Sequence, residues 1–109
     1  MSVLKKSLRD KNADFMVTKR RQKYILRLFV SGLLQNSACA IKNINLICSE
    51  NLKDRYDLEI IDIYQKPDLA VSEQIIVIPV LIIKYPLPER RLIGDLSDHA
   101  KVLEVLNIN

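Results

Sequence analysis

The sequence predicts an α/β fold whose elements follow one another as strand, helix, strand, short helix, strand, strand and helix. Two observations carry this prediction. Short segments rich in β-branched residues alternate with segments that have the apolar period of a helix. In addition, Pro79 lies inside the apolar run IIVIPVLII, where a proline would deprive a central strand of a hydrogen bond. We therefore expect a cis Ile78-Pro79 bond immediately before a strand that begins at Val80.

The first predicted elements are a strand and a long helix. Residues 24–30 (YILRLFV) are β-branched and aromatic, which favours a strand. A helix follows, capped by Asn36 or Ser37 and running to about Cys48 or Asn51. The residues expected near one apolar face of this helix are Ala38, Ile41, Ile44 and Cys48.

A second strand and a short helix come next. Residues 57–64 (DLEIIDIY) alternate in part and predict a strand. Because the preceding helix is long enough to cross over, the first two strands should be parallel, with a right-handed connection. Lys66-Pro67 ends the strand, and Pro67 can open a short helix that continues to about Glu73.

The rest of the chain predicts a hairpin and a final helix. Residues 80–84 and 90–93 should form antiparallel strands, because the turn at 85–88 is too short for a crossover. Gly94 allows a sharp bend. Ser97 is expected to cap the last helix, with Asp98 in its first turn. Its expected sheet-facing residues are Val102, Leu103 and Leu106. A single domain with this order, and with a proline before the third strand, is typical of a thioredoxin-like fold.

Composition limits the class of protein. The chain has 109 residues, enough for one core, and that core must be aliphatic because aromatic residues make up only 6% and Trp is absent. No segment approaches the roughly 20 apolar residues of a membrane-spanning helix. The N-terminus lacks the apolar core and cleavage site of a secretory signal. We therefore expect a cytoplasmic protein.

The charge is concentrated at the N-terminus. Residues 1–23 hold eight Lys or Arg and only Asp10 and Asp14 as acids, so the net charge of this segment is +6. Because the whole chain has a net charge of +4, the remaining residues have a net charge of −2. We expect two parts, a basic arm over residues 1–23 and a folded domain over 24–109. The arm could bind nucleic acid or an anionic membrane, but a solvated tail is the simpler interpretation, and we expect neither partner.

Nothing in the sequence predicts catalysis, a metal site or a cofactor. A redox protein of this fold would need a C-x-x-C motif, and here Cys39 stands alone at the helix start. Cys48 lies nine residues further along the helix, about 13.5 Å away and on the opposite face, so the two cannot form a disulfide. His99 is the only histidine and is expected to be exposed. Asp95 and Asp98 are explained by turn closure and helix capping.

Arg90 and Arg91 form a second basic spot. They could dock an acidic partner or nucleic acid, or they could protect an edge strand against pairing. The sequence leaves these two interpretations equal.

The block Ile93-Gly94-Asp95-Leu96-Ser97-Asp98, with Lys101-Val102-Leu103, resembles the KaiB family of circadian clock proteins. The resemblance runs from about Tyr24 to Leu106 and leaves out the basic arm. It also includes Tyr24-Ile25-Leu26, Gly32, Asn36-Ser37, Ile61-Asp62, Pro67, Leu69-Ala70, Pro79 and the Pro86-Leu87-Pro88 turn.

The resemblance implies a non-enzymatic regulatory adaptor. Such a protein would dock on a KaiC-like ATPase and modulate its phosphorylation or signalling output. Other implied partners are KaiA, a sensor histidine kinase with a KaiB-like domain, and further copies of the chain in a dimer or tetramer. The alternative is a stand-alone stress or signalling module that keeps the fold and has lost KaiC docking.

The chain departs from the KaiB pattern at the contact face that the resemblance implies. Cyanobacterial members carry Arg where Cys39 stands, Lys where Glu59 stands and a small residue where Asp57 stands, so this face loses basic character. The expected partner-binding residues are Arg27, Cys39, Lys42, Asp57, Glu59, Arg90 and Arg91.

The resemblance also implies that the fold could be metamorphic, with an alternative structure of the C-terminal half. The family's glycine and aspartate near the C-terminus correspond to Val105 and Asn107. Valine at 105 would penalise a turn with positive φ and extend the last helix, which favours the thioredoxin-like form. Expected structural or switch positions are Gly32, Pro79, Pro86, Pro88, Gly94, Asp95, Ser97, Asp98, Val105 and Asn107.

Overall fold

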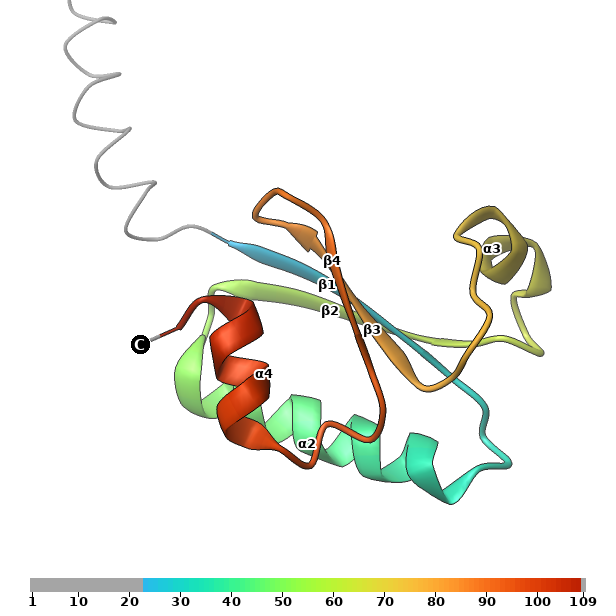
Figure 1. The fold of residues 1–109 in the computed structure, drawn as a ribbon, viewed down its shortest axis with the longest axis horizontal. Coiled ribbons are helices and arrows are strands. Elements are labelled where there is room, and N and C mark those ends of the chain that lie inside the picture. The colour runs from blue at the N-terminus through green and yellow to red at the C-terminus, as the bar shows by residue number, and fades with distance from the viewer. Residues whose placement is uncertain (1–22, 109) are drawn as a thin grey trace, which may run out of the picture.

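A computed structural model describes residues 23–108 of the protein (Figure 1). The predicted basic arm, apart from Lys23, lies outside the described residues. Element types and order agree with the prediction. The elements are β1 (Tyr24–Val30), α2 (Gln35–Asn51), β2 (Tyr56–Asp62), α3 (Pro67–Ser72), β3 (Val80–Tyr85), β4 (Arg90–Ile93) and α4 (His99–Leu106).

The four strands form one sheet in the order β2-β1-β3-β4. β1 is parallel to β2 and antiparallel to β3, and β3 is antiparallel to β4, as expected from the connection lengths. The register places Arg27 of β1 beside Glu59 of β2 on one side and Ile82 of β3 on the other. This central position of β1 is the basis for the charged surface described below.

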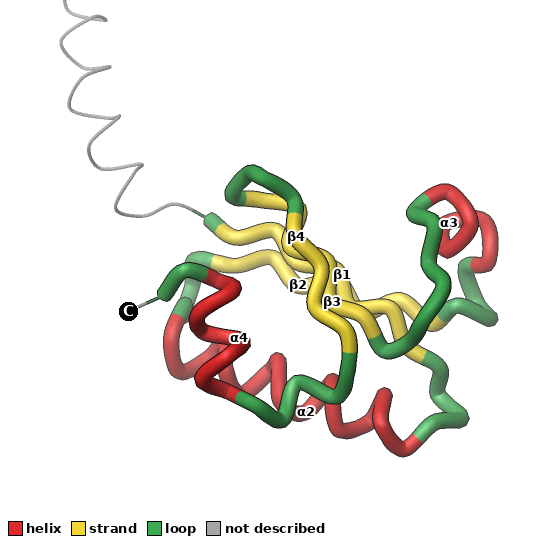
Figure 2. Tube along the Cα trace, viewed as in Figure 1, coloured by secondary structure: helices red, strands yellow, loops and turns green. Residues whose placement is uncertain are grey.

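Helices α2 and α4 cover one face of the sheet, and α3 lies at the end of the other face (Figures 1 and 2). Because strand side chains alternate between faces, β1 contributes Leu26 and Leu28 to the core under α2 and α4, and Phe29 to the core under α3. All three side chains are fully buried. The second core is small, so much of that sheet face remains uncovered.

The predicted caps of both long helices are wrong. α2 begins after Leu34, which makes no side-chain capping bond, and Ser37 lies within the first turn. The Ser37 Oγ instead accepts a 3.0 Å hydrogen bond from the backbone N–H of Ser31. In α4 the cap is Asp98, whose carboxylate accepts a 3.2 Å bond from the Lys101 N–H.

The apolar face of α2 is also rotated from the prediction. Ala38 is exposed and Ile41 only half-buried. Residues that α2 buries are Ser37, Ala40, Ile44, Ile47 and Cys48.

Special backbone conformations occur at several of the positions expected to matter. The Ile78-Pro79 bond is cis, as predicted, and the bonds before Pro86 and Pro88 are cis as well. Gly94 has φ +118°, which few other residues adopt, and so permits the bend after β4. Asn107 has φ 64° and ends α4 in the left-handed conformation.

Candidate interaction surface

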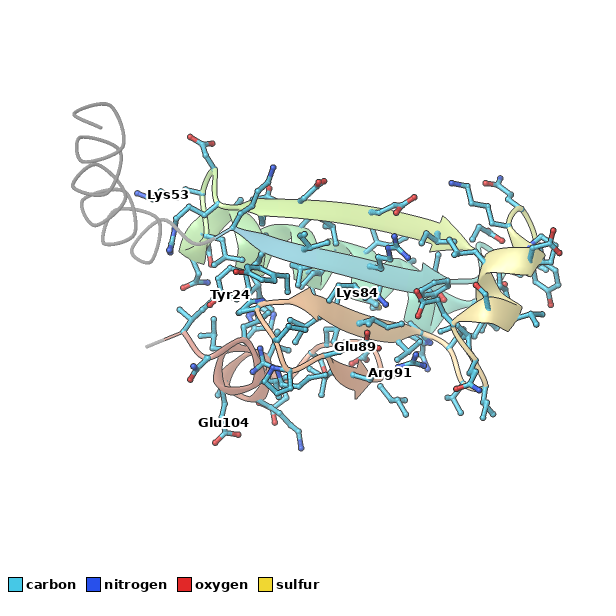
Figure 3. The ribbon with its side chains drawn as sticks, turned by 90° about the horizontal axis from the view of Figure 1, so that it is seen from above. Tyr24, Lys53, Lys84, Glu89, Arg91 and Glu104 are labelled. Carbon is cyan, nitrogen blue, oxygen red and sulfur yellow. The ribbon has the colours of Figure 1, made fainter. Side chains whose placement is uncertain are left out.

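The sheet face opposite α2 and α4 carries an array of charged side chains. We call this surface the open face; Figure 3 looks onto it. It presents Arg27 from the middle of β1, Asp57 and Glu59 from β2, Lys84 from β3 and Arg91 from β4. These residues share a face because the register pairs Arg27 with Glu59 and with Ile82, which pairs in turn with Arg91.

Glu73, immediately after α3, is the centre of this array. Its carboxylate lies 3.1 Å from Arg27 Nη1, 3.1 Å from Lys84 Nζ and 3.6 Å from Arg91 Nη2. The Glu73 side chain is only 15% exposed, so these ion pairs are less screened by solvent than pairs at an exposed surface. One carboxylate therefore joins the end of α3 to three strands.

Two further carboxylates flank Glu73. Glu59 lies 3.6 Å from Arg27 and 3.5 Å from Lys66. Glu89 lies 3.0 Å from Lys84 and 3.6 Å from Arg91, and the labelled side chains of Lys84, Glu89 and Arg91 lie close together in Figure 3. We call the seven side chains the ion-pair cluster: Arg27, Glu59, Lys66, Glu73, Lys84, Glu89 and Arg91.

The cluster shifts the pKa of two of its members, Lys84 and Glu89. Hydrogen bonds to Glu89 and then to Glu73 raise the pKa of the Lys84 ammonium. The same bond to Lys84 lowers the pKa of the Glu89 carboxyl. Each shift favours the charged form, so the ion pair between Lys84 and Glu89 is stabilised in its ionised state.

Asp57 differs from the other acids of the open face. It is exposed at the start of β2, and the described structure gives its carboxylate no ion pair. Glu59, two residues further along, is 46% exposed but already shares its charge with Arg27 and Lys66. The β2 side of the open face is therefore its acidic side, with Asp57 the carboxylate most available to a partner.

Arg90 and Arg91 do not form one basic spot, which corrects the interpretation made from the sequence. The Arg90 guanidinium turns to the helix face, where its Nη1 bonds to the Val105 carbonyl oxygen. The Arg91 guanidinium turns to the open face and donates a 2.6 Å bond to the carbonyl oxygen of Glu73. Adjacent strand residues point to opposite faces, so the two charges act separately.

Cys39 and Lys42 lie on α2, across the sheet from the open face. Cys39 is half-buried. Lys42 is exposed and lines a shallow hollow with Tyr56 at the start of β2. The expected contact residues thus divide into three groups. Arg27, Asp57, Glu59 and Arg91 are together on the open face, Cys39 and Lys42 are on α2, and Arg90 is under α4.

Sequence reasoning missed the centre of the cluster. Glu73 was expected only as the end of the short helix, and Lys84 only as the end of a strand. Lys84 was the available signal, because a lysine next to four buried residues in β3 needs a nearby carboxylate. The sequence does not say which carboxylate, since Glu73 is 11 residues away and Arg27 is 46 residues from it.

The loop between β4 and α4 is held by side chains of α2. Asn43 donates a 2.8 Å bond to the Asp95 carbonyl oxygen and lies 3.3 Å from the His99 Nε2. His99 is therefore half-buried and fixed to α2, rather than exposed as expected. Asp95 accepts a hydrogen bond from the Ser97 N–H, and its bonds with Ser97 lower the pKa of the Asp95 carboxyl.

The two thiols lie in different environments. Both cysteines are free, and Cys48 is completely buried. Burial raises the pKa of the Cys48 thiol to about 12, so it remains protonated. Among residues 23–108, no group of three or more His, Cys, Asp or Glu side chains is placed to hold a metal ion. None of the described helices is long and apolar enough to cross a membrane.

Comparison with known proteins identifies the family. The family profile described as KaiB domain matches residues 27–108. The circadian clock protein KaiB3 of Synechocystis sp. is 46% identical over 84 residues, which cover 77% of this chain and 82% of KaiB3. The circadian clock oscillator protein KaiB of Synechococcus elongatus is 42% identical over 88 residues, covering 81% of this chain and 86% of that protein.

Solved structures agree on the fold. The N-terminal domain of Synechococcus elongatus SasA superposes with a TM-score of 0.63 at 24% identity, covering 78% of this chain and 84% of that domain. Chloroplastic thioredoxin z superposes with a TM-score of 0.68 at 19% identity, covering 87% of this chain and 86% of the thioredoxin. The fold is thioredoxin-like, and the sequence match shows that the chain belongs to the KaiB family.

Proposed function

We propose that the protein is a non-enzymatic regulator that binds a KaiC-like ATPase and modulates its phosphorylation or signalling output. The observation that carries this proposal is the 46% identity with a circadian clock protein over 84 residues. The KaiB domain profile matches residues 27–108, which hold part of β1 and all of the other strands and helices described above. Regulation by binding fits a surface built from ion pairs.

The β2 side of the open face is the contact region that we propose, and Lys42 on α2 lies across the sheet from it. Asp57 offers an exposed carboxylate, and Glu59 is 46% exposed beside it. A partner with basic groups opposite these positions would gain steering and pairing, whereas an acidic partner surface would be repelled. We therefore expect the cognate ATPase to present lysine or arginine at this contact.

Sedimentation with the KaiC-like ATPase of the same host, plus nucleotide, tests the function. Samples followed for several hours should show co-sedimentation and a changed ATPase rate. Asp57→Lys should weaken binding by about tenfold, because it reverses one exposed charge in the contact. Glu104→Lys is the matched control, since Glu104 is an exposed acid on α4, away from the open face (Figure 3). A chain that never co-sediments with an active ATPase would contradict the proposal.

The departures at Cys39, Asp57 and Glu59 favour a second candidate function. A stand-alone stress or signalling module would keep the fold after losing ATPase docking. In that case the wild-type chain and Asp57→Lys would both ignore the ATPase, while each remained folded.

Several finer features belong to the proposal as well. A sensor histidine kinase with a KaiB-like domain would be a competitor for the ATPase, and the fold shared with the SasA domain supports this idea. We also propose a cytoplasmic location, self-association into a dimer or tetramer, and a basic arm at residues 1–23 ahead of the domain at 24–109. Two interconverting folds of the C-terminal half are part of the same proposal.

A further inference from the structure

Residues 64–78 lie between β2 and β3 and include α3; we call this segment the lid. It lies over the end of the open face (Figures 1 and 2). Beneath it is the second core, whose side chains are at most 4% exposed: Phe29, Ile61, Val80 and Ile82. The lid itself contains no buried residue, since each of its side chains is half-buried or exposed. The lid therefore shields apolar surface of the sheet while burying little of its own.

The packing of the lid on the sheet is loose. Three of its apolar side chains lie half-buried against the second core: Leu69, Ile75 and Ile78. Other apolar side chains of the lid face solvent, and Val71 is 76% and Ile76 92% exposed. A hollow of about 260 Å³ is lined by residues 74–77 together with residues of β3 and β4. Burial of apolar surface therefore stabilises the lid less than it stabilises the rest of the domain.

The polar contacts between the lid and the sheet converge at Glu73. Its carboxylate pairs with Arg27, Lys84 and Arg91, one cation from each of β1, β3 and β4. Arg91 also donates a 2.6 Å hydrogen bond to the Glu73 carbonyl oxygen. Among the described residues the lid has one other ion pair, from Lys66 to β2, and its two side chains are 57% and 46% exposed. Such an exposed pair contributes little, so most of the polar attachment of the lid depends on one residue.

We propose that the lid opens from the sheet as a unit, and that the Glu73 carboxylate sets how often it opens. Opening separates Glu73 from its three cations. The ion pairs of Glu89 with Lys84 and Arg91 remain, because none of these three residues belongs to the lid. α3 has six residues, and a helix of that length is not stable alone in water, so α3 unfolds as it leaves the sheet.

Opening gives the open face a second state. In the closed state the second core is covered, and the accessible part of the open face is the charged array. In the open state Phe29, Ile61 and Ile82 lose their cover, so an apolar region appears beside that array. Salt screens the ion pairs of Glu73 and therefore shifts the population toward the open state. Lid opening requires no partner, so it is independent of ATPase binding.

Lid opening also differs from the second fold of the C-terminal half proposed above. When only the lid opens, β3, β4 and α4 keep their hydrogen bonds. A second fold of the C-terminal half would rebuild these elements. Hydrogen exchange distinguishes the two events, because it reports the opening of each amide separately.

Hydrogen exchange of the full chain, followed by NMR at several low urea concentrations, tests the proposal. The probes are the N–H groups of Glu73 and Ile75, which donate 2.9 Å bonds to carbonyl oxygens inside the lid. They should exchange faster than the amides of Ile44 and Ile47 in α2, and with a weaker dependence on urea, because lid opening exposes less surface than global unfolding. Raising the salt from about 0.1 M to about 1 M should accelerate the exchange of the lid amides.

Two matched variants isolate the role of Glu73. Glu73→Gln should accelerate exchange of the lid amides at least about tenfold, because it weakens the contacts that only the closed lid makes. Glu89→Gln is the control, since Glu89 pairs with the same Lys84 and Arg91 but lies outside the lid. Its pairs are present in both states, so Glu89→Gln should not accelerate exchange of the lid amides, even where it lowers the global stability.

Several outcomes would overturn the proposal. Lid and α2 amides that share one free energy and one urea dependence would mean that the lid opens only by global unfolding. Amides of β3, β4 and α4 that exchange together with the lid would mean that the whole C-terminal half opens. Equal acceleration by Glu89→Gln and Glu73→Gln would remove the special role of Glu73. Should Glu73→Gln fail to fold, the salt series on the wild-type chain decides, and lid exchange that ignores salt would overturn the role of the ion pairs.

Discussion

The Tyr24 hydroxyl donates a 2.8 Å hydrogen bond to the Leu106 carbonyl oxygen, joining the first residue of β1 to the last residue of α4. The bond is buried, and it closes a separation of 82 residues. Leu106 itself is fully buried in the core between α2, α4 and the sheet. The position of α4 on the sheet thus depends on a contact made at the opposite end of the described chain.

Tyr24→Phe should therefore destabilise the protein without changing its fold. The substitution keeps the ring but leaves the Leu106 carbonyl buried without this donor, which costs about 1–2 kcal/mol of unfolding free energy. Urea unfolding measures the difference. Tyr85→Phe is the control, because Tyr85 is 41% exposed and its change should cost less than about 0.5 kcal/mol. Equal effects of the two substitutions would contradict the assigned role of Tyr24.

Glu73→Gln should destabilise the fold more than Glu59→Gln. Glu73 contacts Arg27, Lys84 and Arg91 while only 15% exposed, so three cations lose their shared partner, at a cost of about 1–3 kcal/mol. Glu59 is 46% exposed, and its loss should cost less than about 1 kcal/mol. Urea unfolding at low and high salt is the measurement. Both effects should shrink in concentrated salt, and a Glu73 effect no larger than that of Glu59 would contradict its central role.

The fold could be predicted from the sequence because its signals are local. The bounds of β1 and β4 coincide with the predicted segments 24–30 and 90–93, since β-branched runs and turn residues delimit them. The helix caps were predicted wrongly because a serine hydroxyl can form hydrogen bonds with several nearby backbone groups. Ser37 bonds to Ser31 instead of capping α2, a choice that depends on how the chain leaves β1.

The surface was harder to predict than the fold. Arg27, Asp57, Glu59 and Arg91 were expected contacts and do share the open face. Glu73 reaches Arg27 and Arg91 only because α3 folds back over the end of the sheet, and no sequence spacing encodes that approach. Arg90 and Arg91 point to opposite faces because side chains alternate along a strand, so the predicted strand at 90–93 already implied their separation.

Asp98→Ala and Ser97→Ala should distinguish the true cap of α4 from the expected one. Asp98 accepts a hydrogen bond from the Lys101 N–H, so its loss should cost about 1 kcal/mol. The Ser97 side chain does not cap α4, so Ser97→Ala should change stability by less than about 0.5 kcal/mol. Thermal unfolding of the two variants side by side gives the comparison, and a larger loss for Ser97→Ala would refute the assignment.

Cys48 should make the protein less stable at alkaline pH. The pKa of its thiol is about 12 in the folded protein and about 8.5 when unfolded, so the unfolded state releases this proton first. Stability should therefore fall as pH rises above about 8.5, and Cys48→Ala should reduce that slope. Urea unfolding between about pH 7 and pH 10 measures it. An unchanged slope in Cys48→Ala would contradict the prediction.

Alkylation provides a second readout of the same environment. Iodoacetamide at mildly alkaline pH should modify half-buried Cys39 in the native protein and reach Cys48 only after unfolding. Mass spectrometry of peptides distinguishes the two sites. Modification of Cys48 at the same rate as Cys39 would mean that the core around α2 opens readily.

Val105→Gly should weaken α4 and test the proposed second fold. Val105 lies in the last turn of the helix, half-buried against the core, and Asn107 supplies the left-handed end two residues later. Glycine at 105 adds about 1 kcal/mol of backbone cost and removes an apolar contact, so the loss should reach about 1–2 kcal/mol. Ala100→Gly, at an exposed helical position, is the control for backbone cost alone.

If the C-terminal half has an alternative structure close in free energy, Val105→Gly should show a second set of amide signals for residues 97–106, and Ala100→Gly should show a weaker second set. A single set of signals in both variants, despite the lost stability, would leave the thioredoxin-like form as the only fold of this chain.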